Sequence, residues 1–158
     1  MSHIHVCSLS RLADTVAGSR ASHLVSLIND GTPVTRPDSI APERHLFLGF
    51  NDIIAPVDGM TAPGAAHIER LLAFLDGWDR SAPLVVHCFA GISRSTAGAY
   101  IALCALAPEE DERVLAKRLR AASPIATPNQ LMVRLADGVL GRSGRMVAAI
   151  DAIGRGAD

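Results

Sequence analysis

Residues 83–95 read PLVVHCFAGISRS, and two kinds of local pattern meet within this stretch. Residues 83–86 form a short apolar run with two adjacent valines, which is typical of a buried strand. From Thr96 to Ala107 the chain is rich in alanine and other apolar residues, which predicts a helix. Cys88 therefore lies at the turn between a strand and a helix.

The turn at Cys88 combines two sources of positive electrostatic potential. Successive N–H groups of the loop and the positive end of the following helix dipole converge on one point, where an anion is held. The same surroundings favour ionisation of a cysteine to its thiolate, which is the nucleophilic form. We therefore expect Cys88 to be largely a thiolate at neutral pH and to act as a nucleophile.

Four other residues around Cys88 have expected roles. Arg94 lies six residues after Cys88 (94 − 88 = 6), which lets its planar guanidinium grip two oxygens of a phosphoryl group. Gly91, in the middle of the turn, is free to take a positive φ and to approach a ligand closely. We expect Ser95 to donate a hydrogen bond to the sulfur of Cys88, and His87 to hold the loop from behind.

The run from His87 to Ser95 fits the pattern H-C-x-x-G-x-x-R-S at every fixed position. It resembles the signature loop of the cysteine-dependent protein tyrosine phosphatase superfamily, in its small, single-domain, dual-specificity branch. Two further stretches are similar to that branch: Leu46 to Asp52 resembles its strand that ends in an aspartate, and Ala122 to Asn129 resembles its R-P-x-x-x-P-N segment. The resemblance covers roughly residues 45–135.

The resemblance implies a phosphomonoester hydrolase, a protein tyrosine or dual-specificity phosphatase that forms a cysteinyl-phosphate and needs neither metal nor cofactor. Ala122 stands where many relatives carry a basic residue, so either Arg120 replaces it or nothing does. The resemblance offers Asn129 or Gln130 as a residue that orients the attacking water, but we favour a plain helix N-cap as the role of this position. The phosphate-binding residues that the resemblance implies are Cys88, Phe89, Ala90, Gly91, Ile92, Ser93 and Arg94, with His87 and Ser95 in support.

The reaction also needs a carboxylic acid, because a leaving oxygen must be protonated as its bond to phosphorus breaks. Asp52 follows the predicted strand Leu46 to Phe50, so it emerges at the carboxyl edge of the sheet, as Cys88 does. Asp58 is the alternative, because it lies thirty residues before Cys88 (88 − 58 = 30), closer to the usual separation than the thirty-six of Asp52 (88 − 52 = 36). We favour Asp52, since Asp58 sits in a segment typical of a β-turn.

Strand and helix patterns alternate along the chain and predict an α/β fold: a single domain, residues 1–158, with a central, mostly parallel sheet flanked by helices. Besides the run before Cys88, the predicted strands are Ile4 to Cys7, His23 to Ile28 and His45 to Phe50. The predicted helices start after Ser8 or Ser10 as the N-cap, after Thr61 to Pro63, and at Thr96, and three more cover roughly residues 109–122, 128–141 and 143–154.

Composition limits the classes of partner. The chain has 158 residues, 49% of them hydrophobic, which is enough to bury one core without disulfides. Its fifteen basic residues are scattered and its net charge is −1, so nucleic acid is not an expected partner. The expected partner is a phosphorylated protein or a small aryl phosphate, because the variable positions of the loop are uncharged and do not suit a polyanionic substrate.

Several features favour a cytoplasmic protein that does not span a membrane. Three cysteines without a C-x-x-C pair suit a reducing compartment, and Met1 to Ser10 lacks the build of a signal peptide. The longest apolar stretch, Thr96 to Ala107, is about half of the roughly 20 residues that a membrane span needs. His3 and His5 alternate along a strand without a third ligand, so we expect no metal site.

Two other function classes fit parts of the pattern. A phosphate-dependent binding module that has lost catalysis would keep the loop, but the intact Cys88, Arg94 and candidate acid argue against it. Rhodanese-like or arsenate-reductase-like thiol chemistry also uses a C-x5-R loop, but the positions of Gly91 and Ser95 match the phosphatases.

Overall fold

The computed structural model describes residue 1 and residues 3–158. Within these residues, four parallel strands form one sheet in the order β1-β4-β2-β3. The strands are β1 (Ile4–Cys7), β2 (His23–Ile28), β3 (His45–Gly49) and β4 (Leu84–His87). The predicted α/β fold with a central parallel sheet is confirmed, and β3 ends one residue earlier than predicted.

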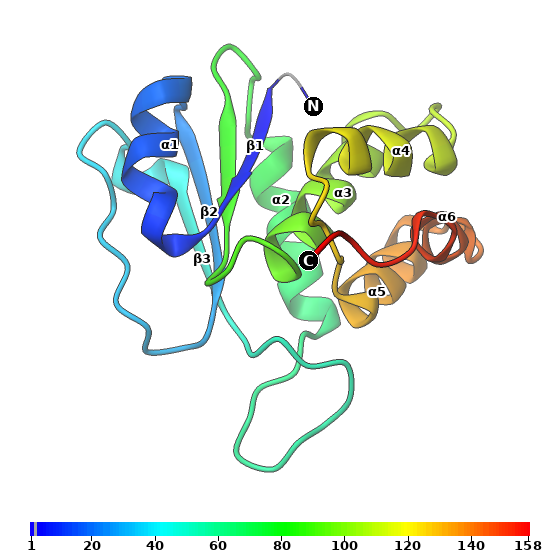
Figure 1. Cartoon of the computed structure of the whole chain (residues 1–158). Coiled ribbons are helices and arrows are strands. Elements are labelled where there is room, and N and C mark those ends of the chain that lie inside the picture. The colour runs from blue at the N-terminus through cyan, green and yellow to red at the C-terminus, as the bar shows by residue number, and fades with distance from the viewer. Residues whose placement is uncertain (2) are drawn as a thin grey trace.

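Helices cover both faces of the sheet (Figure 1). α1 (Leu12–Ser19) lies on one face. The opposite face carries α2 (Ala65–Asp76), α3 (Arg94–Leu106), α4 (Glu112–Ala122), α5 (Gln130–Leu140) and α6 (Arg145–Ile153). α3 is central, because it packs against three strands and three helices. Within the residues that the structure describes, none of the helices is long and apolar enough to cross a membrane.

The two faces of the sheet bury two hydrophobic clusters, because successive side chains of a strand point to opposite faces. Val86 points into the larger cluster with α2 to α6, whereas Val85 points into the smaller cluster beneath α1. α3 approaches the sheet closely at Gly98, where a Cβ would lie 2.7 Å from the side chain of Leu27. This close packing fixes the carboxyl ends of the strands, where the loops of the candidate site begin.

Two helix starts differ from the predictions for local reasons. α3 begins at Arg94, two residues before the predicted start at Thr96, with Ser93 as its N-cap residue. α4 begins at Glu112 rather than near residue 109, because the Asp111 carboxylate accepts a hydrogen bond from the backbone N–H of Arg113 at 2.8 Å. An N-cap of this kind satisfies a backbone donor that the first turn of a helix leaves free.

The prediction that Ser8 or Ser10 caps the first helix is wrong. A short 3-10 turn, η1 (Leu9–Arg11), comes first, and Arg11 then occupies the N-cap position of α1. The hydroxyls of Ser8 and Ser10 bond to each other at 3.0 Å instead of to a helix terminus. The tighter turn places both serines before the first residue of α1.

A long loop, residues 51–64, joins β3 to α2 and projects from the body of the molecule (Figure 1). Its two ends are tied together, because the N–H of Asn51 donates to the carbonyl of Thr61 at 2.7 Å and the N–H of Thr61 donates to Asn51 Oδ1 at 2.9 Å. Both candidate acids, Asp52 and Asp58, lie on this projecting loop.

Candidate active site

The loop of residues 88–93 turns the chain from β4 into α3 and encloses the sulfur of Cys88. Cys88 is 2% exposed, and its Sγ lies 3.1 Å from Ser95 Oγ. The N–H of Gly91 donates to the same sulfur at 3.2 Å. Gly91 has a φ of 77°, and a Cβ there would lie 2.8 Å from the backbone nitrogen of Ser8, so glycine is required. The loop therefore places a backbone N–H and a hydroxyl within hydrogen-bond distance of the sulfur.

Arg94 is the first residue of α3 and is 6% exposed. Its Nη1 donates to Asn29 Oδ1 and to the carbonyl of Phe50, both at 2.7 Å. Within the described residues its buried Nε has no hydrogen-bond partner, and no carboxylate pairs with it. Burying a charge without a counter-ion costs free energy, so an anion from outside the chain would stabilise this guanidinium.

Asp52 lies against the loop although it precedes Ser93 by 41 residues. Its Oδ1 accepts a hydrogen bond from Ser93 Oγ at 2.8 Å and another from Asn129 Nδ2 at 2.8 Å. Asp58 is exposed, and in the part of the chain that the structure describes it makes no hydrogen bond or ion pair to the loop. The structure brings Asp52 to the loop rather than Asp58, and the role of Asp52 as general acid stays a prediction.

Asn129 links the start of α5 to Asp52 and is 3% exposed. Its Oδ1 accepts from the backbone N–H of Met132 at 2.9 Å, which makes it the N-cap of α5. Its Nδ2 donates to Asp52 and, at 3.2 Å, to the carbonyl of Ile53. One side chain thus caps a helix and holds the candidate acid. Gln130, the other residue considered at this position, is the first residue of α5 and is exposed.

His87 is fully buried behind the loop. Its Nδ1 lies 3.0 Å from the carbonyl oxygen of Cys88, and since a carbonyl only accepts, Nδ1 carries the proton. Nε2 therefore accepts from Ser26 Oγ at 2.7 Å, and Ser26 in turn accepts from His45 Nε2 at 2.8 Å. Burial lowers the pKa of both histidines. This chain of hydrogen bonds holds a neutral His87 in one tautomer against the backbone of Cys88.

Sequence reasoning missed four contributors to the site: Ser26, His45, Asn29 and the carbonyl of Phe50. Ser26 carried a signal, because a hydroxyl in the middle of a fully buried strand needs a partner on a neighbouring strand. Asn29 also carried one, since it directly follows β2, which pairs with β4. No sequence signal could point to the carbonyl of Phe50, because every residue has a carbonyl.

A hollow of about 500 Å³ opens in front of Arg94. It lies between the base of the projecting loop and the loop of residues 88–93, and it is larger than the hollow of about 350 Å³ beside Trp78. The residues that line it are Ile28, Asn29, Thr32, Asn51, Asp52, Ile53, Met60, Phe89 and Arg94. The position suits a ligand whose anionic end reaches Arg94.

Arg120 organises the segment that leads to Asn129. Its Nη1 donates to the carbonyls of Ser123, Pro124 and Ala126, and its Nη2 donates to the carbonyl of Gly154 at 2.7 Å. A guanidinium therefore does support this segment, although Ala122 itself has no side chain to do so. Arg120 acts on the backbone and not on the loop of residues 88–93.

The two other cysteines differ in place: Cys7 lies on β1 beside His87 of β4, next to the loop of residues 88–93, whereas Cys104 lies in α3. Cys7 and Cys104 are buried and free, and burial raises the pKa of Cys104 to about 11. Such thiols pack as small hydrophobic side chains. Among the residues described, no three His, Cys, Asp or Glu side chains are grouped to hold a metal ion.

No protein-family model and no curated protein matches this sequence. Solved structures do match its fold. A human tyrosine phosphatase-like serine/threonine/tyrosine-interacting protein superposes with a TM-score of 0.70 at 14% identity, over 90% of this chain and 94% of that chain. Human DUSP28 superposes with a TM-score of 0.64 at 20% identity, over 97% of this chain and 96% of that chain. The Cydia pomonella PTP-2 phosphatase superposes with a TM-score of 0.65 at 22% identity, over 85% of this chain and 84% of that chain.

These likenesses extend over most of each chain, so they concern the whole architecture and not one motif. The resemblance read from the loop at Cys88 is confirmed at the level of the fold. The parallel sheet with its flanking helices, from α1 on one face to α2–α6 on the other, is the fold of the tyrosine and dual-specificity phosphatases.

Proposed function

We propose that this protein is a cysteine-dependent phosphomonoester hydrolase that acts on aryl phosphates, above all on phosphotyrosine in proteins. The observation that carries the proposal is the meeting, at one turn, of the Cys88 sulfur with the buried guanidinium of Arg94. A phosphoryl group would supply the acceptors that Arg94 lacks among the described residues. The fold, shared with tyrosine and dual-specificity phosphatases, supports the same function.

Arg94 is held in an orientation that leaves one edge of its guanidinium for the substrate. Both of its hydrogen bonds, to Asn29 and to Phe50, use Nη1. Nε and Nη2 form the opposite edge, which matches two oxygens of a phosphoryl group. The N–H groups of residues 88–93 hold the remaining equatorial oxygen and share the charge.

In the first step, the Sγ of Cys88 attacks phosphorus in line with the leaving oxygen. A sulfur–phosphorus bond forms, the phosphorus–oxygen bond breaks, and Asp52 gives its proton to the leaving oxygen. Since Oδ1 of Asp52 accepts hydrogen bonds from Ser93 and Asn129, the proton is carried on Oδ2.

In the second step, Asp52 is a carboxylate and acts as the base. It takes a proton from a water that attacks the cysteinyl-phosphate, and the sulfur–phosphorus bond breaks to release phosphate. The hydroxyl of Ser95 stabilises the departing thiolate by a hydrogen bond, for which its 3.1 Å distance from Sγ is suitable. The products are phosphate, the alcohol or phenol, and the original thiolate.

The proposed partner is a phosphorylated protein or a small aryl phosphate rather than a nucleic acid or a membrane. The proposed compartment is the cytoplasm, which the three free cysteines support. A binding module without turnover is the second candidate, because one structure of this fold is described as phosphatase-like and as an interacting protein.

Hydrolysis of para-nitrophenyl phosphate between pH 4.5 and 8, in the presence of a chelator, tests the proposal. We expect turnover by the wild type and none by Cys88→Ser, which should still bind inorganic phosphate. Asp52→Asn should lower turnover by roughly 10²–10⁴-fold, and Asp58→Asn, its matched control on the same loop, should not. A folded wild type that binds vanadate without turnover would favour the binding module, and an active Cys88→Ser would refute the covalent step.

A further inference from the structure

Large apolar side chains are exposed around the candidate active site. In the part of the chain that the structure describes, eight large hydrophobic residues are exposed, and six of them lie on the projecting loop 51–64, on the loop of residues 88–93 or on the segment beside it. Four of the six line hollows beside the site, and we call these four the apolar rim: Met60, Phe89, Ile92 and Ile125. Phe89 is the most exposed of them, at 65%. A cluster of this kind on a protein surface marks a contact site.

The rim borders the site on two sides. Met60 and Phe89 line the hollow of about 500 Å³ in front of Arg94. Ile92 and Ile125 line a second hollow, of about 450 Å³, and both hollows include Asp52. A molecule that places a phosphoryl group against Arg94 occupies the first hollow, and the second hollow adjoins it at Asp52. A substrate that fills both must extend to either side of its phosphorylated group.

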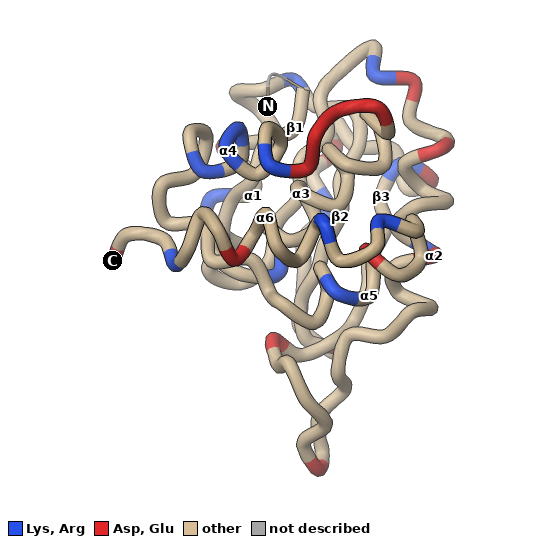
Figure 2. The backbone as a smooth tube through the Cα atoms, turned by 90° about the vertical axis from the view of Figure 1, so that its right-hand side faces the viewer, with Lys and Arg blue, Asp and Glu red and all other residues tan. Residues whose placement is uncertain are grey.

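The same surroundings offer little to an anionic neighbour of the phosphoryl group. The loop 51–64 carries Asp52 and Asp58 and no Lys or Arg (Figure 2). Arg155 lines the second hollow but is paired with Asp158 at 3.0 Å. Among the residues that line the two hollows, the remaining cation is Arg94, which the phosphoryl group itself occupies. Acidic groups on the substrate would therefore find no unpaired cation among these lining residues.

We propose that the substrate is a segment of a phosphorylated protein in which apolar residues flank a single phosphorylated residue, and that acidic or multiply phosphorylated segments are poor substrates. The proposal rests on the proposed function. Contact with the rim removes apolar surface of both partners from water, which favours binding of such segments. A phosphate on an anionic lipid surface fits less well, because binding to that surface needs clustered Lys or Arg.

Matched phosphotyrosine peptides test this proposal, with leucine and valine, serine and glycine, or aspartate and glutamate on both sides of the phosphotyrosine. We expect kcat/KM to be about tenfold higher for the apolar peptide than for the serine and glycine peptide, and lowest for the acidic one. Equal or better turnover of the acidic peptide would overturn the proposal. So would faster turnover of phosphatidylinositol phosphate in phosphatidylcholine vesicles than of the apolar peptide.

Two variants locate the preference on the rim. Met60→Gln should reduce the ratio of kcat/KM between the apolar peptide and the serine and glycine peptide by at least about threefold. Val139→Gln is the matched control, because Val139 is exposed to a similar degree, 41% against 50%, but lies on α5 away from the hollows. An unchanged ratio in Met60→Gln, or an equal fall in Val139→Gln, would contradict the proposal.

Para-nitrophenyl phosphate separates this inference from the proposed function. The small substrate lacks flanking groups, so its Cys88-dependent turnover reports the chemistry alone. If that turnover is absent, the proposed function fails. If it is present and the peptides show no preference, only the apolar rim proposal fails.

Discussion

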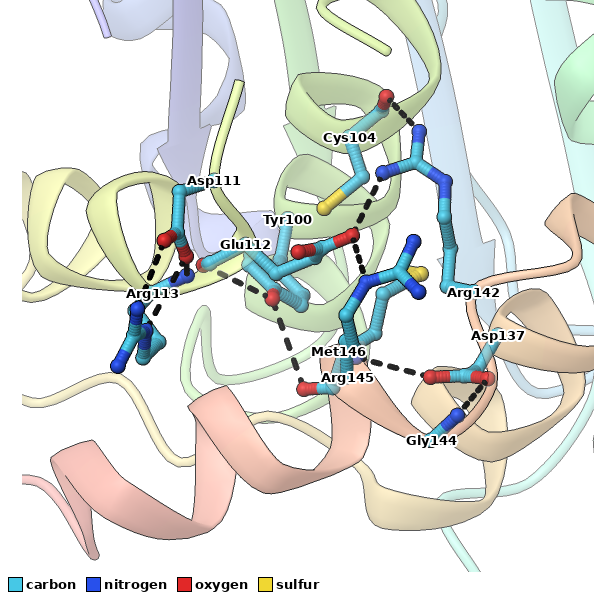
Figure 3. A network of polar contacts seen from close by, with 10 residues as sticks. All are labelled: Tyr100, Cys104, Asp111, Glu112, Arg113, Asp137, Arg142, Gly144, Arg145 and Met146. Carbon is cyan, nitrogen blue, oxygen red and sulfur yellow. Dashed lines mark hydrogen bonds and ion pairs between the residues drawn. The ribbon is translucent and has the colours of Figure 1, made fainter. Parts of the chain in front are cut away.

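Arg94 and Arg142 are buried to the same extent, each 6% exposed, but their surroundings are opposite. Arg142 forms an ion pair with Glu112 Oε1 at 3.0 Å and donates to the carbonyl of Cys104 at 2.7 Å (Figure 3). Arg94 has only neutral acceptors, from Asn29 and Phe50, among the described residues. One guanidinium is paired with a carboxylate within the fold, and the other has no carboxylate partner among the described residues.

Figure 3 shows what the satisfied arginine holds together. Glu112 begins α4 and also pairs with Arg145 of α6 at 3.1 Å, while the hydroxyl of Tyr100 in α3 donates to the carbonyl of Glu112 at 3.1 Å. The network thus joins several helices on one side of the sheet. Burial of a cation therefore does not by itself mark a functional site, and the counter-ion is what distinguishes these two arginines.

The largest expected effect follows from Arg94→Lys. A lysine keeps the charge but loses the planar pair of donors, so kcat/KM for para-nitrophenyl phosphate should fall by roughly 10³-fold. The midpoint of thermal unfolding should change little, because no carboxylate depends on Arg94. Steady-state kinetics and a thermal melt of the same sample give both values. Activity within threefold of the wild type would show that Arg94 does not grip the phosphoryl group.

Arg142→Met should show the reverse behaviour. It leaves the buried Glu112 with the exposed Arg145 as its remaining cation, so the free energy of unfolding should fall by roughly 3–5 kcal/mol. The kcat of the molecules that remain folded should be unchanged. Urea unfolding measures the loss, and Arg113→Met, which breaks an exposed pair with Asp111, is the control that should show no measurable change. Equal free energies of unfolding for Arg142→Met and Arg113→Met would show that Arg142 does not stabilise the fold.

Ligand binding should distinguish the two arginines in a third way. Inorganic phosphate at 100 times its Kd should stabilise the wild type by about 2.7 kcal/mol, because it binds only the folded state. At the same phosphate concentration, this stabilisation should disappear in Arg94→Lys and persist in Arg142→Met. Thermal melts over a phosphate series measure it. Persistence in Arg94→Lys would place the anion elsewhere.

The pH dependence of stability should report on Glu112. Although burial alone would raise the pKa of Glu112, its backbone hydrogen bond and those from Arg142 and Arg145 hold that pKa below its ordinary value. The unfolded chain therefore binds a proton more readily than the folded one, so the contribution is complete above the ordinary glutamate pKa and is lost as the pH falls below it. Urea midpoints between pH 3 and 7 should fall less toward low pH in Glu112→Gln than in the wild type. If the urea midpoints of Glu112→Gln and the wild type fall in parallel toward low pH, Glu112 does not make this contribution to stability.

The smallest expected effect concerns the hydrogen bonds behind the loop. Ser26→Ala removes the donor to His87 Nε2 and leaves that buried nitrogen unsatisfied, so kcat should fall by roughly tenfold. The rate constant for alkylation of Cys88 by iodoacetate at pH 7 should fall, whereas a loss of stability alone would raise it by exposing the sulfur. An unchanged or higher rate of alkylation would limit Ser26 to a structural role.

The fold and the local part of the site could be predicted from sequence, because their signals are short-range. The succession of strand and helix patterns along the chain predicted β1 to β4, and a single loop carries Cys88, Gly91 and Arg94. The contacts that complete the site join distant residues: Ser26 with His87 across 61 positions, and Asp52 with Asn129 across 77. Nothing local specifies such pairs.

The buried ion pair between Glu112 and Arg142 could not be predicted for the same reason. Glu112 and Arg142 look like ordinary charged residues of amphipathic helices and their connections, and they meet across 30 positions. Only the packing of α4 against α6 reveals that both are buried. The loop around Arg94 predicts it as the phosphoryl-binding arginine, a role that stays a proposal, whereas nothing in the sequence indicated the arginine that pairs with a carboxylate inside the fold.

The most direct test of the central claim is intact-mass spectrometry of Asp52→Asn, acid-quenched during reaction with para-nitrophenyl phosphate. This substrate has a leaving group that needs little help from an acid, whereas hydrolysis of the intermediate needs Asp52 as base, so the covalent form should accumulate. We expect a species heavier by one phosphoryl group, with that group on Cys88. The double variant Asp52→Asn/Cys88→Ser should form no such species. Turnover of the substrate without any phosphorylated Cys88 would contradict it.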